Sequence, residues 1–167
     1  MDPNRQIEQV APISCDRCPR LVEFLCKSKE ENPEWFNGPV PSFGSINAEV
    51  LIIGLAPGLR GANRTGRPFT GDFAGKVLYQ TLISHGFASA FYEKNGNDNL
   101  TLKNVRITNA VRCVPPGNKP SGIEINNCRV FLSTEIDRMT NLKVILCMGR
   151  IAHYTLVRHF KLSAKNY

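Results

Sequence analysis

The residues best suited to chemistry are cysteines, of which the chain has six. Cys15 and Cys18 form a C-x2-C pair, and Cys113 and Cys128 come much later, with fourteen residues between them. A zinc ribbon uses two close pairs, so this spacing disfavours that template without excluding zinc. An iron–sulfur cluster accepts wider spacing because each iron takes one thiolate. The four residues therefore hold either a metal or a cluster, or they are unliganded buried thiols.

The other two cysteines are predicted to pack without a ligand. Cys147 lies in an apolar run typical of a buried strand, and Cys26 shares a predicted early helix with Val22 and Leu25. Disulfides are not expected, because residues 1–10 are polar and lack the apolar stretch of a signal peptide. Without export the default environment is reducing, which keeps thiols free.

The loop over residues 54–72 is the second candidate for chemistry, and it reads GLAPGLRGANRTGRPFTGD. Its five glycines allow the backbone to approach a ligand closely, and its arginines are phosphate donors. Phe69 could stack on a planar ring, and Asp72 is the only carboxylate of the loop. The loop lacks the phosphate-binding patterns G-x4-G-K-[ST] and G-x-G-x-x-G. The alternative is a mobile surface loop in which Asp72 only caps the following helix.

The elements around these residues alternate between strand and helix. Apolar runs predict buried strands over residues 49–54, 105–112 and 142–148. One helix is predicted to begin at Asp72 and to end near Gly86. A second is predicted to begin at the capping-box sequence of Ser121 and Glu124, and a third near residue 150. This alternation predicts a parallel sheet covered by helices, with the Gly-rich loop at the carboxyl ends of the strands.

Composition and charge favour a globular protein with an anionic partner. The chain has 167 residues, 42% of them hydrophobic, and a net charge of +7. The charge is uneven: residues 1–38 carry −2, residues 39–167 carry +9, and no acid follows Asp137. A basic body favours phosphate-rich partners such as nucleic acid, although a solubility charge without any partner is the alternative. No apolar run approaches the roughly 18 residues that cross a bilayer, so no membrane segment is expected.

These segments together resemble the family 5 (type b) uracil-DNA glycosylases. The sequences GLAPG, GANRTGR and FTGD resemble the first active-site motif of that family, over residues 54–58, 61–67 and 69–72. The sequences ITNAVRC and PPGNKP resemble a second signature shared by families 4 and 5, over residues 107–113 and 115–120. The four cysteines above match the cluster ligands of these families in order and spacing, and the resemblance runs from about Cys15 to the end of the chain.

The resemblance implies a three-layer α/β/α fold with a central, mostly parallel sheet. A [4Fe–4S] cluster would tie the N-terminal cysteine-containing segment, residues 1–38, to this single domain of residues 1–167. The implied cluster ligands are Cys15, Cys18, Cys113 and Cys128.

The implied activity is that of a base-excision repair glycosylase, which hydrolyses the N-glycosidic bond of uracil and other deaminated bases in DNA. The base must first be flipped out of the duplex. Phe69 would stack on the base, and Asn109 would hydrogen-bond to its polar edge. Asp72, a second catalytic candidate beside Asn109, would orient water or offset charge on the sugar.

The same resemblance implies roles for neighbouring residues in the two motifs. The loop residues Leu55, Ala56 and Gly58 would contact the base. The implied DNA contacts are Arg60, Arg64 and Arg67. For Asn109, the alternative is a buried strand residue whose amide is satisfied by backbone groups.

Two departures from the family pattern bear on function. Family 4 members carry an acid where this chain has Leu55, which favours family 5, although Arg60 stands where family 5 often has His. The family also places a His-Pro-Ser motif beyond the last predicted helix, and none of His85, His153 and His159 is followed by Pro-Ser. We therefore expect a fragment or a naturally shortened form with weak or no activity.

Several functional expectations follow. The partner is DNA containing uracil or other deaminated bases. The protein is expected to be a monomer, cytoplasmic and nucleoid-associated in a prokaryote, without membrane contact. The alternatives are a shortened, non-catalytic iron–sulfur module that binds nucleic acid, and a family 4-like glycosylase.

Overall fold

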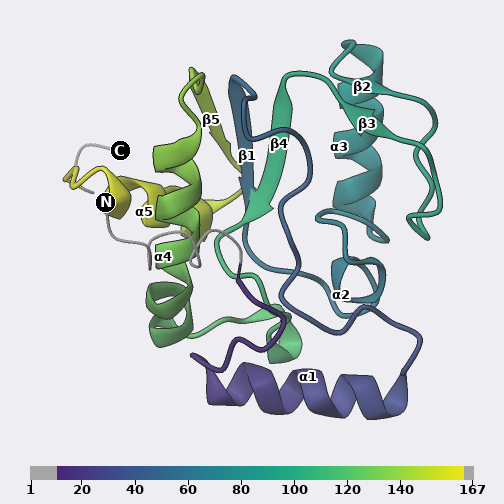
Figure 1. Ribbon diagram of the computed structural model, residues 1–167, viewed down its shortest axis with the longest axis vertical. Coiled ribbons are helices and arrows are strands. Elements are labelled where there is room, and N and C mark those ends of the chain that lie inside the picture. Colours follow the sequence, from purple (N-terminus) through teal and green to yellow (C-terminus); the bar gives the residue numbers. More distant parts are fainter. Residues whose placement is uncertain (1–10, 164–167) are drawn as a thin grey trace.

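The computed structural model describes residues 11–163 and has a parallel sheet at its centre, with helices on both faces (Figure 1). The sheet has the strand order β4-β1-β5, and its members are β1 (Val50–Gly54), β4 (Val105–Asn109) and β5 (Val144–Cys147). Both pairings are parallel, and Gly54 at the end of β1 lies opposite Asn109 at the end of β4. The expected α/β class with a central parallel sheet is confirmed.

The helices divide between the two faces of the sheet. On one face α4 (Gly122–Arg138) and α5 (Arg150–His159) pack against Leu51 and Ile53 of β1. On the other face α3 (Phe73–Ser84) packs against Ile52 of β1 and Ile107 of β4. The alternating residues of β1 thus serve two cores, which explains its continuous apolar sequence.

The N-terminal helix α1 (Pro19–Glu31) lies beyond the end of the sheet to which the β4 arrow points (Figure 1). Its buried residues Leu21 and Leu25 form a third core with Val111, Val114 and Phe131. The chain then returns along β4, where Phe43 makes an antiparallel bridge to Ile107.

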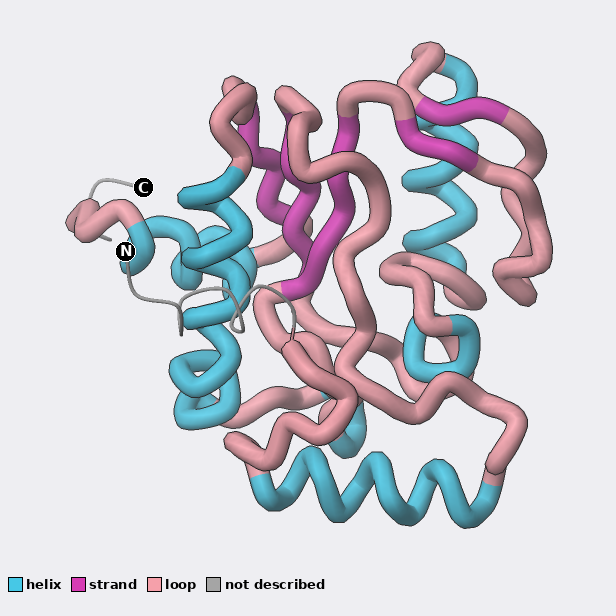
Figure 2. Tube along the Cα trace, viewed as in Figure 1, coloured by secondary structure: helices cyan, strands magenta, loops and turns pink. Residues whose placement is uncertain are grey.

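Short elements complete the fold. They are α2 (Ala62–Thr65), the 3-10 turn η2 (Pro116–Asn118), and an antiparallel pair of β2 (Ala88–Ser89) with β3 (Thr101–Leu102), drawn at the upper right of Figure 2. The sequence pattern did not predict α2, β2 or β3, because elements of two to four residues carry no periodicity. Among the described residues, no helix is long and apolar enough to span a membrane.

Local signals predicted the helix starts well. The Asp72 carboxylate accepts a hydrogen bond from the Gly75 amide at 2.7 Å and so caps α3. Ser121 and Glu124 form the expected reciprocal capping box at the start of α4. The strands are shorter than expected: β4 ends at Asn109 rather than at residue 112. The expectation of a buried strand over residues 142–148 is wrong in part, because β5 is an edge strand and its residues Val144 and Leu146 are exposed.

Candidate functional site

The candidate base-binding site lies at the carboxyl end of the sheet, where the Gly-rich loop leaves β1. Gly54 is buried there between the side chains of Phe69 and Asn109. A Cβ atom at Gly54 would lie 2.5 Å from Asn109 Oδ1 and 2.6 Å from Phe69 Cζ. The absence of a side chain at this position therefore lets the aromatic ring and the amide meet, as the two predicted roles require.

The Asn109 amide is buried without a protein partner. The residue is 3% exposed, and within residues 11–163 its side chain takes part in no hydrogen bond. The amide oxygen and nitrogen keep some solvent access, so they are free to bond a ligand that supplies both an acceptor and a donor. This geometry contradicts the alternative in which backbone groups satisfy Asn109.

Phe69 is held in an uncommon backbone conformation. Its φ angle is 55°, in the left-handed region that bulky residues rarely adopt. A Cβ atom at Gly75 would lie 1.7 Å from the Phe69 carbonyl oxygen, so only glycine allows α3 to approach this turn. The surrounding structure must therefore hold Phe69 in place.

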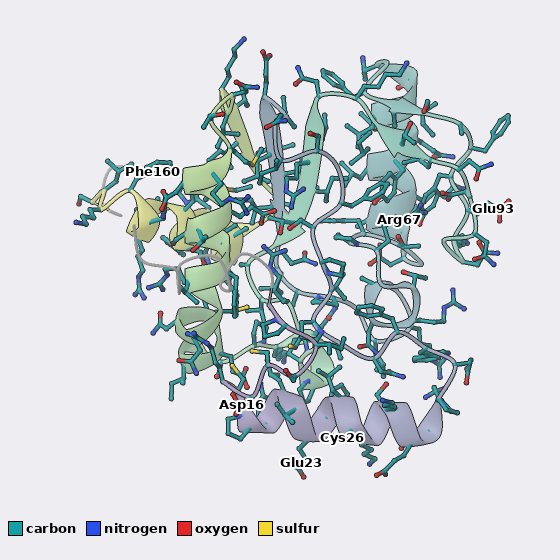
Figure 3. The ribbon with its side chains drawn as sticks, in the orientation of Figure 1. Asp16, Glu23, Cys26, Arg67, Glu93 and Phe160 are labelled. Carbon is teal, nitrogen blue, oxygen red and sulfur yellow. The ribbon has the colours of Figure 1, made fainter. Side chains whose placement is uncertain are left out.

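Arg67 supplies much of that support, and Figure 3 shows it beside α3. Its guanidinium forms a two-pronged ion pair with Asp98, with distances of 2.5 Å and 2.8 Å. It also donates from Nε to the Thr70 hydroxyl at 3.0 Å. Three aromatic rings surround the guanidinium carbon at 5.2–5.7 Å from their centroids, namely Phe43, Tyr79 and Tyr92. Arg67 is thus a largely buried structural residue of the loop, and its donors are taken up by groups of the protein.

Two tyrosines complete the support of the same turn. The Tyr79 hydroxyl donates to the Pro68 carbonyl at 2.8 Å, and the Gly71 amide donates to the Tyr92 hydroxyl at 3.1 Å. Burial raises the pKa of Tyr79 well above its ordinary value, so the residue remains a neutral donor. Asp98, Tyr79 and Tyr92 were not predicted as site residues, and no local pattern marks them because their partners lie far away in the chain.

The remaining predicted loop residues are more accessible. Arg60 is exposed, and Arg64 reaches only the Lys94 carbonyl, at 3.3 Å. Leu55, Ala56 and Gly58 are partly buried in the loop directly after β1.

Asp72 is exposed, and its two oxygens have different surroundings. Oδ1 caps α3, whereas Oδ2 lies 3.9 Å from the position that a Cβ of Gly58 would take. Asp72 therefore caps α3, as the alternative proposed, and its second carboxylate oxygen is left available to a ligand.

A buried ionic network anchors β4 beneath the site. Glu135 of α4 accepts hydrogen bonds from Arg106 and from Arg112, the latter at 2.5 Å. Although burial opposes ionisation, the two arginines hold the pKa of Glu135 below its ordinary value. Glu135 was not predicted as a site residue, although its spacing from Leu132 and Cys128 places it on the buried face of α4.

The four predicted ligand cysteines line a single pocket between α1, the loop after β4, and α4. The pocket is lined by Ala11, Cys15, Arg17, Cys18, Leu21, Val22, Val111, Arg112, Cys113, Asn127, Cys128 and Phe131. N–H groups point at two of the sulfurs. The Arg112 backbone amide donates to Cys128 Sγ at 3.3 Å, and the Asn127 side-chain amide donates to Cys18 Sγ at 3.8 Å. Burial, then the charges of the other thiols, raises the pKa of Cys113 to about 12.

The metal-binding donors that this pocket offers are four thiols. Within residues 11–163, no three His, Cys, Asp or Glu side chains lie close enough together to hold one metal ion. All six cysteines are free, so no disulfide competes for the thiols. Cys26 is exposed on α1, at the lower edge of Figure 3, and Cys147 belongs to the core of the sheet. Neither of them lines the pocket, as predicted, but the expectation that Cys26 packs against its neighbours is wrong, because its side chain is exposed.

Comparison with known proteins supports the motif assignment. The model of the uracil DNA glycosylase superfamily matches residues 41–166. A Type-5 uracil-DNA glycosylase of Thermus thermophilus is 42% identical over 155 residues, which cover 89% of this chain and 70% of that protein.

Relatives of lower identity are also uracil-DNA glycosylases. A Type-5 uracil-DNA glycosylase of Pyrobaculum aerophilum is 36% identical over 84% of this chain and 63% of its own length. A Type-4 uracil-DNA glycosylase of Archaeoglobus fulgidus is 34% identical over 74% of this chain and 54% of its own length. The chain thus spans between about half and 70% of the relatives it matches.

Proposed function

Because the chain belongs to the uracil-DNA glycosylase superfamily, we propose that it acts in DNA base-excision repair by hydrolysing the bond between uracil and deoxyribose. The observation that carries the proposal is the unpartnered, buried amide of Asn109 opposite the ring of Phe69. A flipped pyrimidine needs this pair of contacts, one for its polar edge and one for its face.

The polar edge of uracil offers carbonyl acceptors and an N–H donor. An amide side chain has both complements, and its burial makes each hydrogen bond stronger than it would be in water. Phe69 contributes stacking, and backbone amides of the loop over residues 55–58 contribute further donors to the base or to DNA. As the bond breaks, the base leaves as an anion, which fixed donors stabilise in the transition state.

Asp72 is the carboxylate that we assign to the sugar side of the reaction. One of its oxygens is committed to the helix cap, and this bond fixes the orientation of the other. The free oxygen would orient the attacking water and offset the positive charge that develops on the sugar.

Arg60 and Arg64 would contact the DNA backbone from the same loop. Arg67 is left out of this set, because its guanidinium is occupied by Asp98 and Thr70.

We infer further that Cys15, Cys18, Cys113 and Cys128 hold a [4Fe–4S] cluster. The common pocket and the two N–H groups directed at sulfur support this inference, since hydrogen bonds to the sulfurs are usual around such clusters. When bound, the cluster would be structural, joining the segment before α1 to the loop after β4 and to α4. The ion pair of Arg20 with Glu124, at 2.7 Å, already joins α1 to α4 without it.

Uracil release from a labelled oligonucleotide tests the proposal. We expect weak or no uracil release from residues 1–167 and clear release from the chain extended to the length of its relatives. In the extended chain Asn109→Ala should abolish release, and Asn99→Ala, a change at an exposed loop residue, should leave it unaltered. The experiment should include the chain extended to the length of its relatives, so that activity supplied by further residues is detected. Binding of uracil-containing DNA without release by either form would contradict the glycosylase proposal and favour a non-catalytic binding module.

A further inference from the structure

A second pocket lies between α4 and α5. It has a volume of about 200 Å³, and its lining includes Asn126 and Arg129 of α4 with Ile151, Tyr154 and Arg158 of α5. It contains none of the residues that the sequence predicted to bind a base, DNA or a metal. Two arginines line this pocket, although charged side chains are uncommon between packed helices.

The two arginines share a single neutral acceptor. Asn126 Oδ1 accepts from Arg129 Nη2 at 2.5 Å and from Arg158 Nη1 at 3.5 Å. In the described part of the chain no carboxylate forms an ion pair with either guanidinium. Arg129 Nε is moreover buried and has no hydrogen-bond partner there. Two cations therefore lie close together with unused donors between them.

Within residues 11–163, the neighbouring charged groups also leave the two guanidiniums without a counter-ion. Burial, and then the charge of Arg158, holds the pKa of Arg129 below its ordinary value. The three acids of α4 have other partners: Glu124 and Glu135 pair with other arginines, and Asp137 lies 3.7 Å from His159. No acid follows Asp137 in the sequence. An anion between the two guanidiniums would relieve their repulsion and take up the free donors.

The position of the pocket connects it to the base-binding site. Helix α5 begins directly after β5, at the carboxyl end of the parallel sheet. Asn109 lies at this same end, on β4. A neighbouring hollow is lined by Leu55, Met148, Arg150 and Ile151, so Ile151 borders both hollows. A polyanion that follows the surface away from Leu55 would reach the two arginines next.

We propose that Arg129 and Arg158 bind a phosphate group, and that in the protein–DNA complex this group is a backbone phosphate flanking the flipped base. The proposal rests on the proposed function, and it adds a DNA contact outside both sequence motifs. Arginine suits this role because its planar fork donates two hydrogen bonds to one phosphate.

The test measures the salt dependence of binding to a duplex without uracil, by fluorescence anisotropy. Arg129→Gln/Arg158→Gln is compared with Arg138→Gln, which removes a charge from an exposed residue of the same helix without touching the pocket. Each lost phosphate contact lowers the log–log slope by roughly 0.9. We expect a loss of about this size in the double variant beyond any change in the control. Equal slopes in the two proteins would overturn the proposal.

Two further measurements keep the result interpretable. Arg158→Gln alone changes an exposed side chain, so it tests the pocket if the double variant fails to fold. Inorganic phosphate is also titrated against the wild type at constant ionic strength. Thermal stabilisation by phosphate that depends on both arginines, with an unchanged DNA slope, would identify a free-phosphate site and refute the DNA contact. Uracil release is scored separately, so failure of the glycosylase proposal is distinguishable from failure of this one.

Discussion

Asp98 accepts two hydrogen bonds from the Arg67 guanidinium, at 2.5 Å and 2.8 Å, although the two residues are 31 positions apart in the chain. This pair fastens the loop over residues 93–99 to the turn that presents Phe69. Their mutual attachment gives the base-binding ring a rigid support, which is what a preorganised recognition site needs.

The first prediction concerns stability and pH. The Arg67 guanidinium, then the amides of Glu93 and Leu100, hold the pKa of Asp98 at about 2 against the opposing effect of burial. A lowered carboxyl pKa stabilises the folded state by about 2 kcal/mol at neutral pH. This stabilisation is complete above about pH 4 and is lost as the pH falls towards 2. Asp98→Asn should therefore lower the unfolding free energy at pH 7 and converge with the wild type near pH 2.

Urea unfolding of both proteins between pH 2 and 7 measures this difference directly. The difference between the two curves isolates Asp98 from the other carboxylates, which titrate in both proteins. A constant difference across the whole range would show that Asp98 does not owe its effect to ionisation.

The second prediction concerns Gly54. Gly54→Ala places a methyl group 2.5 Å from Asn109 Oδ1 and 2.6 Å from the Phe69 ring, so one of these side chains must move. Overpacking of this kind costs about 1–3 kcal/mol, and here it also separates the two base contacts. We expect uracil release to fall at least tenfold. Gly122→Ala is the matched control, because a Cβ there meets nothing within 4 Å. Equal activity in both variants would exclude the close approach at Gly54 from recognition.

The third prediction separates the two roles of Asp72. Asn caps a helix about as well as Asp, whereas Ala loses about 1 kcal/mol of cap energy. Asp72→Asn should therefore keep wild-type stability yet slow uracil release more than DNA binding. Asp72→Ala should lose both stability and activity. Unfolding midpoints and single-turnover rates measure the two effects, and a wild-type rate in Asp72→Asn would remove the residue from the mechanism.

The fourth prediction concerns the cysteine pocket. Protein purified without oxygen should be brown and contain about four irons per chain. Cys113→Ser should lose iron and colour, because Cys113 is buried in the pocket, whereas Cys26→Ser should keep both, because Cys26 is exposed and outside it. Metal analysis and visible absorption give the answer. One zinc ion per chain in place of iron would contradict the cluster assignment.

The structure brings some of the predicted site residues together and gives another an unexpected partner. Phe69 and Asn109 were predicted as partners of one base, and the structure brings them together at Gly54. Arg67 was predicted to contact DNA, but Asp98 and Thr70 occupy its guanidinium. An arginine in a glycine-rich loop has the same local sequence whether it faces a phosphate or a buried carboxylate. Only the partner decides between the two.

By itself the sequence determined the class of fold, the starts of the helices and the family. Asp72 and Ser121 mark helix starts because a cap is a contact between residues three positions apart, and β1 is recognisable because its two faces are both buried. The tertiary structure alone decided that Arg67 pairs with Asp98 and that Arg129 meets Arg158 between two helices. Each of these contacts joins residues from different elements, and their distance depends on how the elements pack. Local hydrogen bonding and hydrophobic periodicity do not encode that packing.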